Sequence, residues 1–121
     1  MEQANIEIVS TAEDIEGFKK EVERVRVDES LMEYIIAIIS ETRNNPLIDI
    51  GSSPRGAIAL FKSAKGCAAF YGRDFVIPED IKRMAIPTLR HRIMLKPELE
   101  LEGLKVEQVI TDILSKIKVP R

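Results

Sequence analysis

The fold is decided by residues 51–72, which read GSSPRGAIALFKSAKGCAAFYG. Ser53 is a residue type that caps helices and Pro54 suits the first helical position, so a helix is predicted to start there. Gly72 is placed to end it. Residues at helical spacing predict a buried face, and several of them are small enough for a neighbouring helix to approach closely. This face comprises Ala57, Leu60, Phe61, Ala64, Cys67, Ala68 and Tyr71.

Two more helices are expected upstream of this stretch. Ser10 and Glu13 form a capping-box pattern that predicts a helix start at Ser10, and residues 1–9 are expected as an extended lead-in or an artificial junction. The apolar stripe of this helix is Ile15, Phe18, Val22 and Val25. Asp28 is the expected N-cap of the next helix, which should end at residues 44–46 because proline cannot continue the hydrogen-bond ladder.

The C-terminal half also has a helical pattern. Pro78 is expected to open a helix that breaks or kinks at Pro87, with a short second turn over residues 89–92. Residues 98–102 alternate in polarity and suit a brief extended segment, whereas residues 105–117 form a clean amphipathic helix. The predicted fold class is therefore all-α, a compact bundle of about five helices, possibly with a very short extended pairing.

Composition restricts the classes of function. The chain has 121 residues, which fits one domain, and a net charge of -2. That balance argues against a partner held mainly by phosphate charge, such as a nucleic acid. No apolar run is long enough to span a bilayer. A single cysteine, Cys67, excludes an internal disulfide, is expected to be buried, and fits a reducing compartment such as the cytoplasm.

Catalytic and metal-binding patterns are not evident. His91 is the only histidine, and no metal-ligand spacing appears. Gly51 and Gly56 have the spacing of a phosphate-binding P-loop, but Ala57 and Ile58 stand where its lysine and hydroxyl residue belong. We therefore expect no catalytic residue and no metal in this chain, which should not hydrolyse ATP by itself.

Arg55 is the candidate binding residue. It lies in the first turn of the predicted helix, where free N–H groups attract anions and a guanidinium adds a fixed charge and forked donors for phosphate. The alternative is an arginine that faces solvent, paired with Asp49. A separate basic cluster is either a contact surface or is neutralised by the nearby Glu98, Glu100 and Glu102. The cluster comprises Lys82, Arg83, Arg90, His91, Arg92 and Lys96.

Several spaced motifs resemble the MoxR family of AAA+ ATPases. Residues 51–56 look like the family's sensor 2 motif, and the likeness continues through residues 57–65 and 72–81. Residues 89–93 look like its Leu-x-His-Arg element. The resemblance covers roughly residues 10–117, and motifs in the right order are more specific than any one of them.

The resemblance implies that residues 10–121 are the C-terminal helical lid of a two-part ATPase. The N-terminal ATPase module, with its Walker motifs, is expected to be absent from this chain. By the resemblance Arg55 is the sensor 2 arginine that contacts ATP phosphates, with Pro54 and Ser53 setting the helix start. ATP and magnesium belong to the intact parent, which would be an ATPase, and no cofactor is expected to bind tightly to the lid alone.

The implied partners are the lid's own ATPase module and neighbouring subunits of a ring, commonly a hexamer. Such ATPases resemble chaperones that assemble or activate client proteins, often with metal insertion, while the isolated lid is expected to be monomeric. Three alternatives remain: the lid of a magnesium-chelatase-like protein, a free-standing helical protein-interaction module, and a helix-turn-helix DNA binder, which the acidic balance disfavours. The roles of Arg83, Arg90, His91 and Arg92 stay open.

Overall fold

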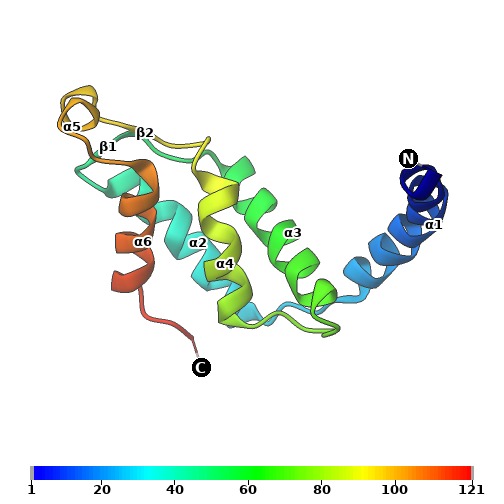
Figure 1. Cartoon of the computed structure of the whole chain (residues 1–121). Coiled ribbons are helices and arrows are strands. Elements are labelled where there is room, and N and C mark those ends of the chain that lie inside the picture. Colours follow the sequence, from blue (N-terminus) through cyan, green and yellow to red (C-terminus); the bar gives the residue numbers. More distant parts are fainter. Residues whose placement is uncertain (1, 121) are drawn as a thin grey trace.

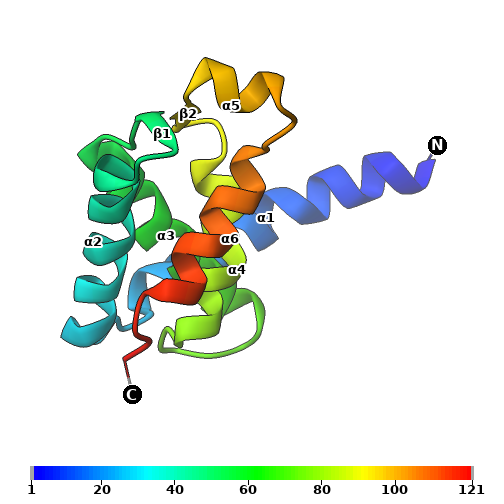
Figure 2. The same ribbon diagram turned by 90° about the vertical axis from the view of Figure 1, so that its left-hand side faces the viewer.

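A computed structural model describes the backbone of residues 2–120 and the side chains of residues 12–120. Helices α2, α3, α4 and α6 form a bundle, and α1 extends away from it (Figures 1 and 2). The predicted all-helical class with a very short extended pairing is confirmed. The elements in chain order are α1 (Glu2–Arg24), α2 (Glu29–Asn44), β1 (Ile48–Ile50), α3 (Pro54–Phe70), α4 (Pro78–Leu89), β2 (Met94–Leu95), α5 (Pro97–Leu101) and α6 (Val106–Lys116).

The core is made of aliphatic side chains that the bundle helices turn toward one another. Each fully buried side chain of this kind stabilises the fold by about 1.5–3 kcal/mol relative to exposure. Helices α2, α3, α4 and α6 share one core, and α3 and α4 lie side by side (Figure 1). The largest fully buried apolar side chains are Ile38, Leu60, Ile81, Leu89, Val109, Ile110 and Ile113.

Helix α1 differs from its prediction. It begins at Glu2, so residues 2–9 are helical rather than extended and Ser10 lies inside the helix instead of capping it. The physical reason is that neither glycine nor proline interrupts the chain before Gly17. Met1 and the side chain of Ser10 lie outside the described residues. The predicted apolar stripe is only partly buried, because Ile15 and Phe18 are exposed where α1 leaves the bundle.

The predicted break at Pro87 does not occur, because α4 continues through Pro87 to Leu89. Proline removes only the one N–H that would bond four residues back, and the bond from Arg90 to Ile86 still closes the last turn. Residues 90–92 then form a non-helical turn. Tyr71, predicted to be buried, is exposed because it follows the last residue of α3.

The extended pairing lies elsewhere than expected. Residues 97–101 form helix α5, with Pro97 in the first turn and acidic residues after it, so the expected extended segment at residues 98–102 is wrong. Strand β1 instead pairs antiparallel with β2, where Ile48 lies opposite Leu95. This pairing joins the end of α2 to the segment after α4.

Candidate functional site

The turn before α3 is held against the end of α2. The Thr42 hydroxyl donates to the Ile39 carbonyl at 2.6 Å and accepts a hydrogen bond from the Ser52 N–H at 3.0 Å. Gly51 lies so close that an added Cβ would come within 2.5 Å of the Thr42 carbonyl oxygen. Only glycine fits there, so Gly51 and Ser52 serve to position the helix start.

The first turn of α3 is fixed from the other side by α4. A Cβ on Gly56 would meet the Ser52 Oγ at 1.8 Å and the Leu89 Cδ2 at 3.4 Å. Ser52, Gly56 and Leu89 are all buried. The small residues of the motif are therefore structural, and they hold the α3 start between the ends of α2 and α4.

The three predicted site residues differ in exposure from the buried residues of this turn. Ser53, Pro54 and Arg55 are all exposed, and Pro54 opens α3 as expected. Ser53 holds the N-cap position, but its side chain makes no capping hydrogen bond. The first turn of α3 contains no acidic residue, so the positive end of the helix is not neutralised from within it.

Arg55 is a cation without an ion-pair partner among the described side chains. None of the ion pairs formed within residues 12–120 includes it, and Asp49 is therefore not its partner. A guanidinium that projects into solvent from an uncapped helix start is suited to bind an anion such as phosphate.

Three members of the basic cluster lie in two different places. On α4, the Arg83 guanidinium lies 4.7 Å from the Tyr71 ring centroid, and its Nη1 lies 3.9 Å from the Cys67 Sγ. His91 and Arg92 instead line a groove between α3 and α4. Over residues 12–120, none of the ion pairs joins the cluster to Glu98, Glu100 or Glu102, so the expected neutralisation by these residues is wrong.

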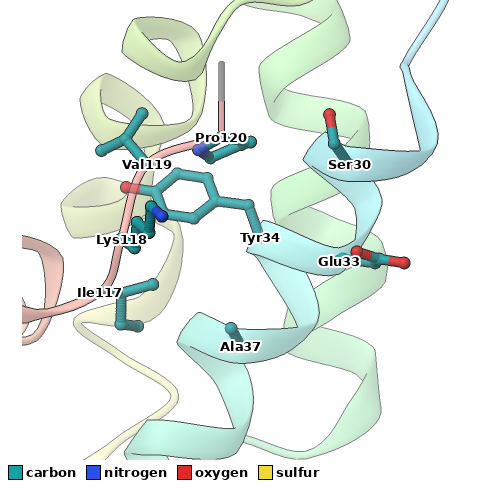
Figure 3. A pocket seen from close by; sticks show the side chains of 8 residues that line it. All are labelled: Ser30, Glu33, Tyr34, Ala37, Ile117, Lys118, Val119 and Pro120. Atoms are coloured by element: carbon teal, nitrogen blue, oxygen red, sulfur yellow. The ribbon is translucent and has the colours of Figure 1, made fainter.

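A second hollow, of about 450 Å³, lies between α2 and the C-terminal tail. Tyr34 extends from α2 toward Val119 and Pro120 (Figure 3). Its hydroxyl is buried and has no hydrogen-bond partner among the described atoms. Burial, and then the charge of Glu79, raise the pKa of this phenol, which keeps it neutral. The sequence placed Tyr34 on a helix, within the segment that resembles the family, and predicted no role for its hydroxyl.

The remaining sequence expectations concern Cys67, metals and membranes. Cys67 is a free, buried thiol, as predicted, and burial, followed by Asp80, raises its pKa. Within the described residues no cluster of histidine, cysteine or carboxylate side chains could hold a metal ion. None of the described helices combines the length and apolarity needed to cross a bilayer.

Comparison with known proteins agrees with this geometry. The model of the AAA lid domain family matches residues 40–113, which include the turn that carries Arg55. The chain belongs to the AAA lid domain family. It is 45% identical over 115 residues to the uncharacterized protein YeaC of Bacillus subtilis. The aligned region covers 95% of this chain and 36% of YeaC.

Two further likenesses narrow the type of lid. The chaperone MoxR1 of Mycobacterium tuberculosis is 27% identical over 104 residues, covering 78% of this chain and 28% of MoxR1. The solved structure of a "putative ATPase" from Cytophaga hutchinsonii superposes with a TM-score of 0.80 at 40% identity, covering 84% of this chain and 34% of that one. This chain is a C-terminal lid of the MoxR family of AAA+ ATPases. Magnesium-chelatase subunits ChlI are also similar.

The lid spans about a third of the length of YeaC and of the Cytophaga hutchinsonii protein. The activity of a whole protein of this family therefore depends on residues outside the lid described here. The exposed Arg55 and the groove lined by His91 and Arg92 present cations that are suited to bind an anion.

Proposed function

We propose that this lid contributes Arg55 as the sensor 2 arginine of a MoxR-type AAA+ ATPase, where it contacts the phosphates of ATP. The observation that carries the proposal is an exposed guanidinium in the first turn of α3, with no ion-pair partner among the described side chains. Ser53 and Pro54 set the helix start that aims it.

The mechanism follows from how phosphoryl transfer is catalysed. Little covalent work is asked of a protein in this reaction, so positioning and charge stabilisation dominate. A charge-assisted hydrogen bond from Arg55 to a phosphate oxygen would be worth about 1.5–3 kcal/mol. Because the contact exists only while the phosphate is in place, it would bias the lid toward a closed position.

The packing around Arg55 supports such coupling. The backbone of the turn is packed closely at Gly51 against the end of α2, and Gly56 lies against Leu89 at the end of α4, so movement of the turn is linked to these helix ends. A pull on the guanidinium would therefore act on the whole lid rather than on a flexible loop. We infer that ATP binding and hydrolysis change the lid angle in this way.

At the level of the whole protein, we propose an ATPase that uses ATP and magnesium and assembles as a ring, commonly a hexamer. Lid movement would drive chaperone-like assembly or activation of client proteins. Support comes from the family membership and from the similarity to the chaperone MoxR1.

The test is steady-state ATPase activity of the complete gene product that contains this lid. Arg55→Ala should lower turnover at least about tenfold, as expected for the loss of one charge-assisted contact, without changing the thermal melt, because the side chain is exposed. Lys62→Ala, an exposed cation on the same helix, is the matched control and should leave turnover unchanged. Normal turnover in Arg55→Ala would overturn the role.

A different class of function has one observation in its favour. Several large apolar side chains are exposed, among them Phe70 at 75% and Tyr71 at 54%, both at the end of α3. Such side chains suit a contact with another protein surface. If Arg55→Ala retained full activity, a protein-interaction module would become the better account of this domain.

A further inference from the structure

The start of α3 and the end of α4 lie at the same end of the molecule. These two helix ends are adjacent, because a Cβ placed on Gly56 would lie 3.4 Å from the Leu89 Cδ2. Helices α3 and α4 run side by side (Figure 1), and residues 90–92 follow directly where α4 ends. Arg55 and residues 90–92 therefore emerge at one end of the same helix pair.

A groove of about 510 Å³ runs between these two helices from that end. Ala59 and Ser63 lie one and two turns after Arg55, so all three follow one stripe of α3. The Thr88 hydroxyl donates to the Ser63 Oγ at 3.3 Å and so links the two walls. The lining residues are Ala59, Ser63, Met84, Pro87, Thr88, His91 and Arg92.

The groove is positively charged at one end and has no carboxylate in its lining. His91 and Arg92 are exposed, and no ion pair formed within residues 12–120 occupies them. Arg83, by contrast, is engaged with Tyr71 and Cys67. His91 and Arg92 thus lie at the end of the helix pair where Arg55 also has no ion-pair partner among the described side chains.

A phosphate chain fits this arrangement better than an acidic protein segment. The groove is open to solvent, and its cations lie at the end next to the start of α3. Guanidinium groups bind phosphate oxygens through forked, charge-assisted hydrogen bonds, and two of them close together, one at the start of α3 and one in the turn after α4, could bind one multiply charged anion.

We propose that Arg92, assisted by His91, is a second nucleotide-binding cation of this lid, at the same end of the α3–α4 pair as Arg55. This inference rests on the proposed function of Arg55. The ligand class is the di- or triphosphate of a nucleotide. Arg92 binds phosphate oxygens directly, so the lid contributes two arginines to the anion instead of one.

The experiment measures the affinity for ADP and for a non-hydrolysable ATP analogue by isothermal titration calorimetry with the complete gene product. Arg92→Ala should weaken ADP binding at least about tenfold, the loss expected for one charge-assisted contact, and Arg92→Lys should restore part of it. Arg83→Ala is the control, because this exposed arginine lies on the same helix pair but is turned toward Tyr71. It should bind ADP with unchanged affinity.

The outcomes separate this inference from the proposal on which it rests. If Arg55→Ala weakens binding of the ATP analogue and Arg92→Ala weakens binding of neither nucleotide, Arg92 is no ligand contact and the sensor role of Arg55 stands. If neither variant weakens binding of either nucleotide, both proposals fail. If Arg92→Ala keeps its ADP affinity but loses ring assembly in sedimentation velocity, the groove binds an acidic protein segment, and the nucleotide role of Arg92 is overturned.

Discussion

Arg73 donates two parallel hydrogen bonds to the carboxylate of Asp80, at 2.6 and 2.7 Å. The Asp80 side chain is completely buried, and the Ile77 N–H donates a third bond to it at 2.8 Å. Burial alone would raise the pKa of this carboxyl, but the bonds from Arg73 and Ile77 outweigh it and hold the pKa below its usual value. The pair ties the connection after α3 to the first turn of α4.

Breaking this pair should destabilise the lid strongly. In Asp80→Asn the charge is lost and the Arg73 guanidinium keeps no full partner, so we expect the free energy of unfolding to fall by about 3 kcal/mol. Urea denaturation measures it. Asp74→Asn is the control, since Asp74 lies in the same connection but pairs with Arg26 at 4.0 Å with both side chains exposed. Its loss should stay below about 0.5 kcal/mol.

The same pair predicts a pH dependence of stability. Because the pKa of Asp80 is lowered in the folded state, its ion pair contributes fully above the unfolded pKa of about 3.9 and is lost as the pH falls through the folded value. The difference in unfolding free energy between wild type and Asp80→Asn should therefore be constant near neutral pH and shrink below about pH 4. A difference that stays the same down to the acid transition would contradict the ionised pair.

Two glycines of α3 should respond oppositely to alanine. At Gly56 a Cβ would meet the Ser52 Oγ at 1.8 Å, within a buried turn, so Gly56→Ala should cost about 1–3 kcal/mol of unfolding free energy. At Gly66 nothing lies within 4 Å of the added Cβ, so Gly66→Ala should stabilise the helix by about 0.5–1 kcal/mol. Thermal melts of both variants test the pair, and equal shifts would show that the α3 start is not packed as described.

The Thr42 hydroxyl should be essential to the turn before α3. Thr42→Val keeps the shape of the side chain but leaves the buried Ser52 N–H without an acceptor, at a cost of about 1–3 kcal/mol. Thr111→Val removes an exposed hydroxyl that bonds only the Glu107 carbonyl, and it should change stability by less than about 0.5 kcal/mol. Chemical denaturation of the two variants gives the comparison, and similar losses would mean that the Ser52 bond is not structural.

The helix starts that were predicted correctly depend on local chemistry. Asp28 accepts from the Ser30 N–H as an N-cap, and Pro54 and Pro78 open their helices because a proline needs no N–H partner in the first turn. These signals lie within a few residues of the helix end, so sequence alone suffices to read them. The errors at Pro87 and residues 98–102 arose because either backbone conformation was locally tolerable there.

The sequence by itself determined the helical class and pointed to Arg55, through the spacing of apolar residues and the motif around Gly51 and Pro54. Only the tertiary structure decided what surrounds that arginine. Contacts between residues far apart in the chain bury Ser52 against Thr42 and place Arg92 at the same end as Arg55. Local periodicity carries no information about such approaches, because they depend on how whole helices pack against one another.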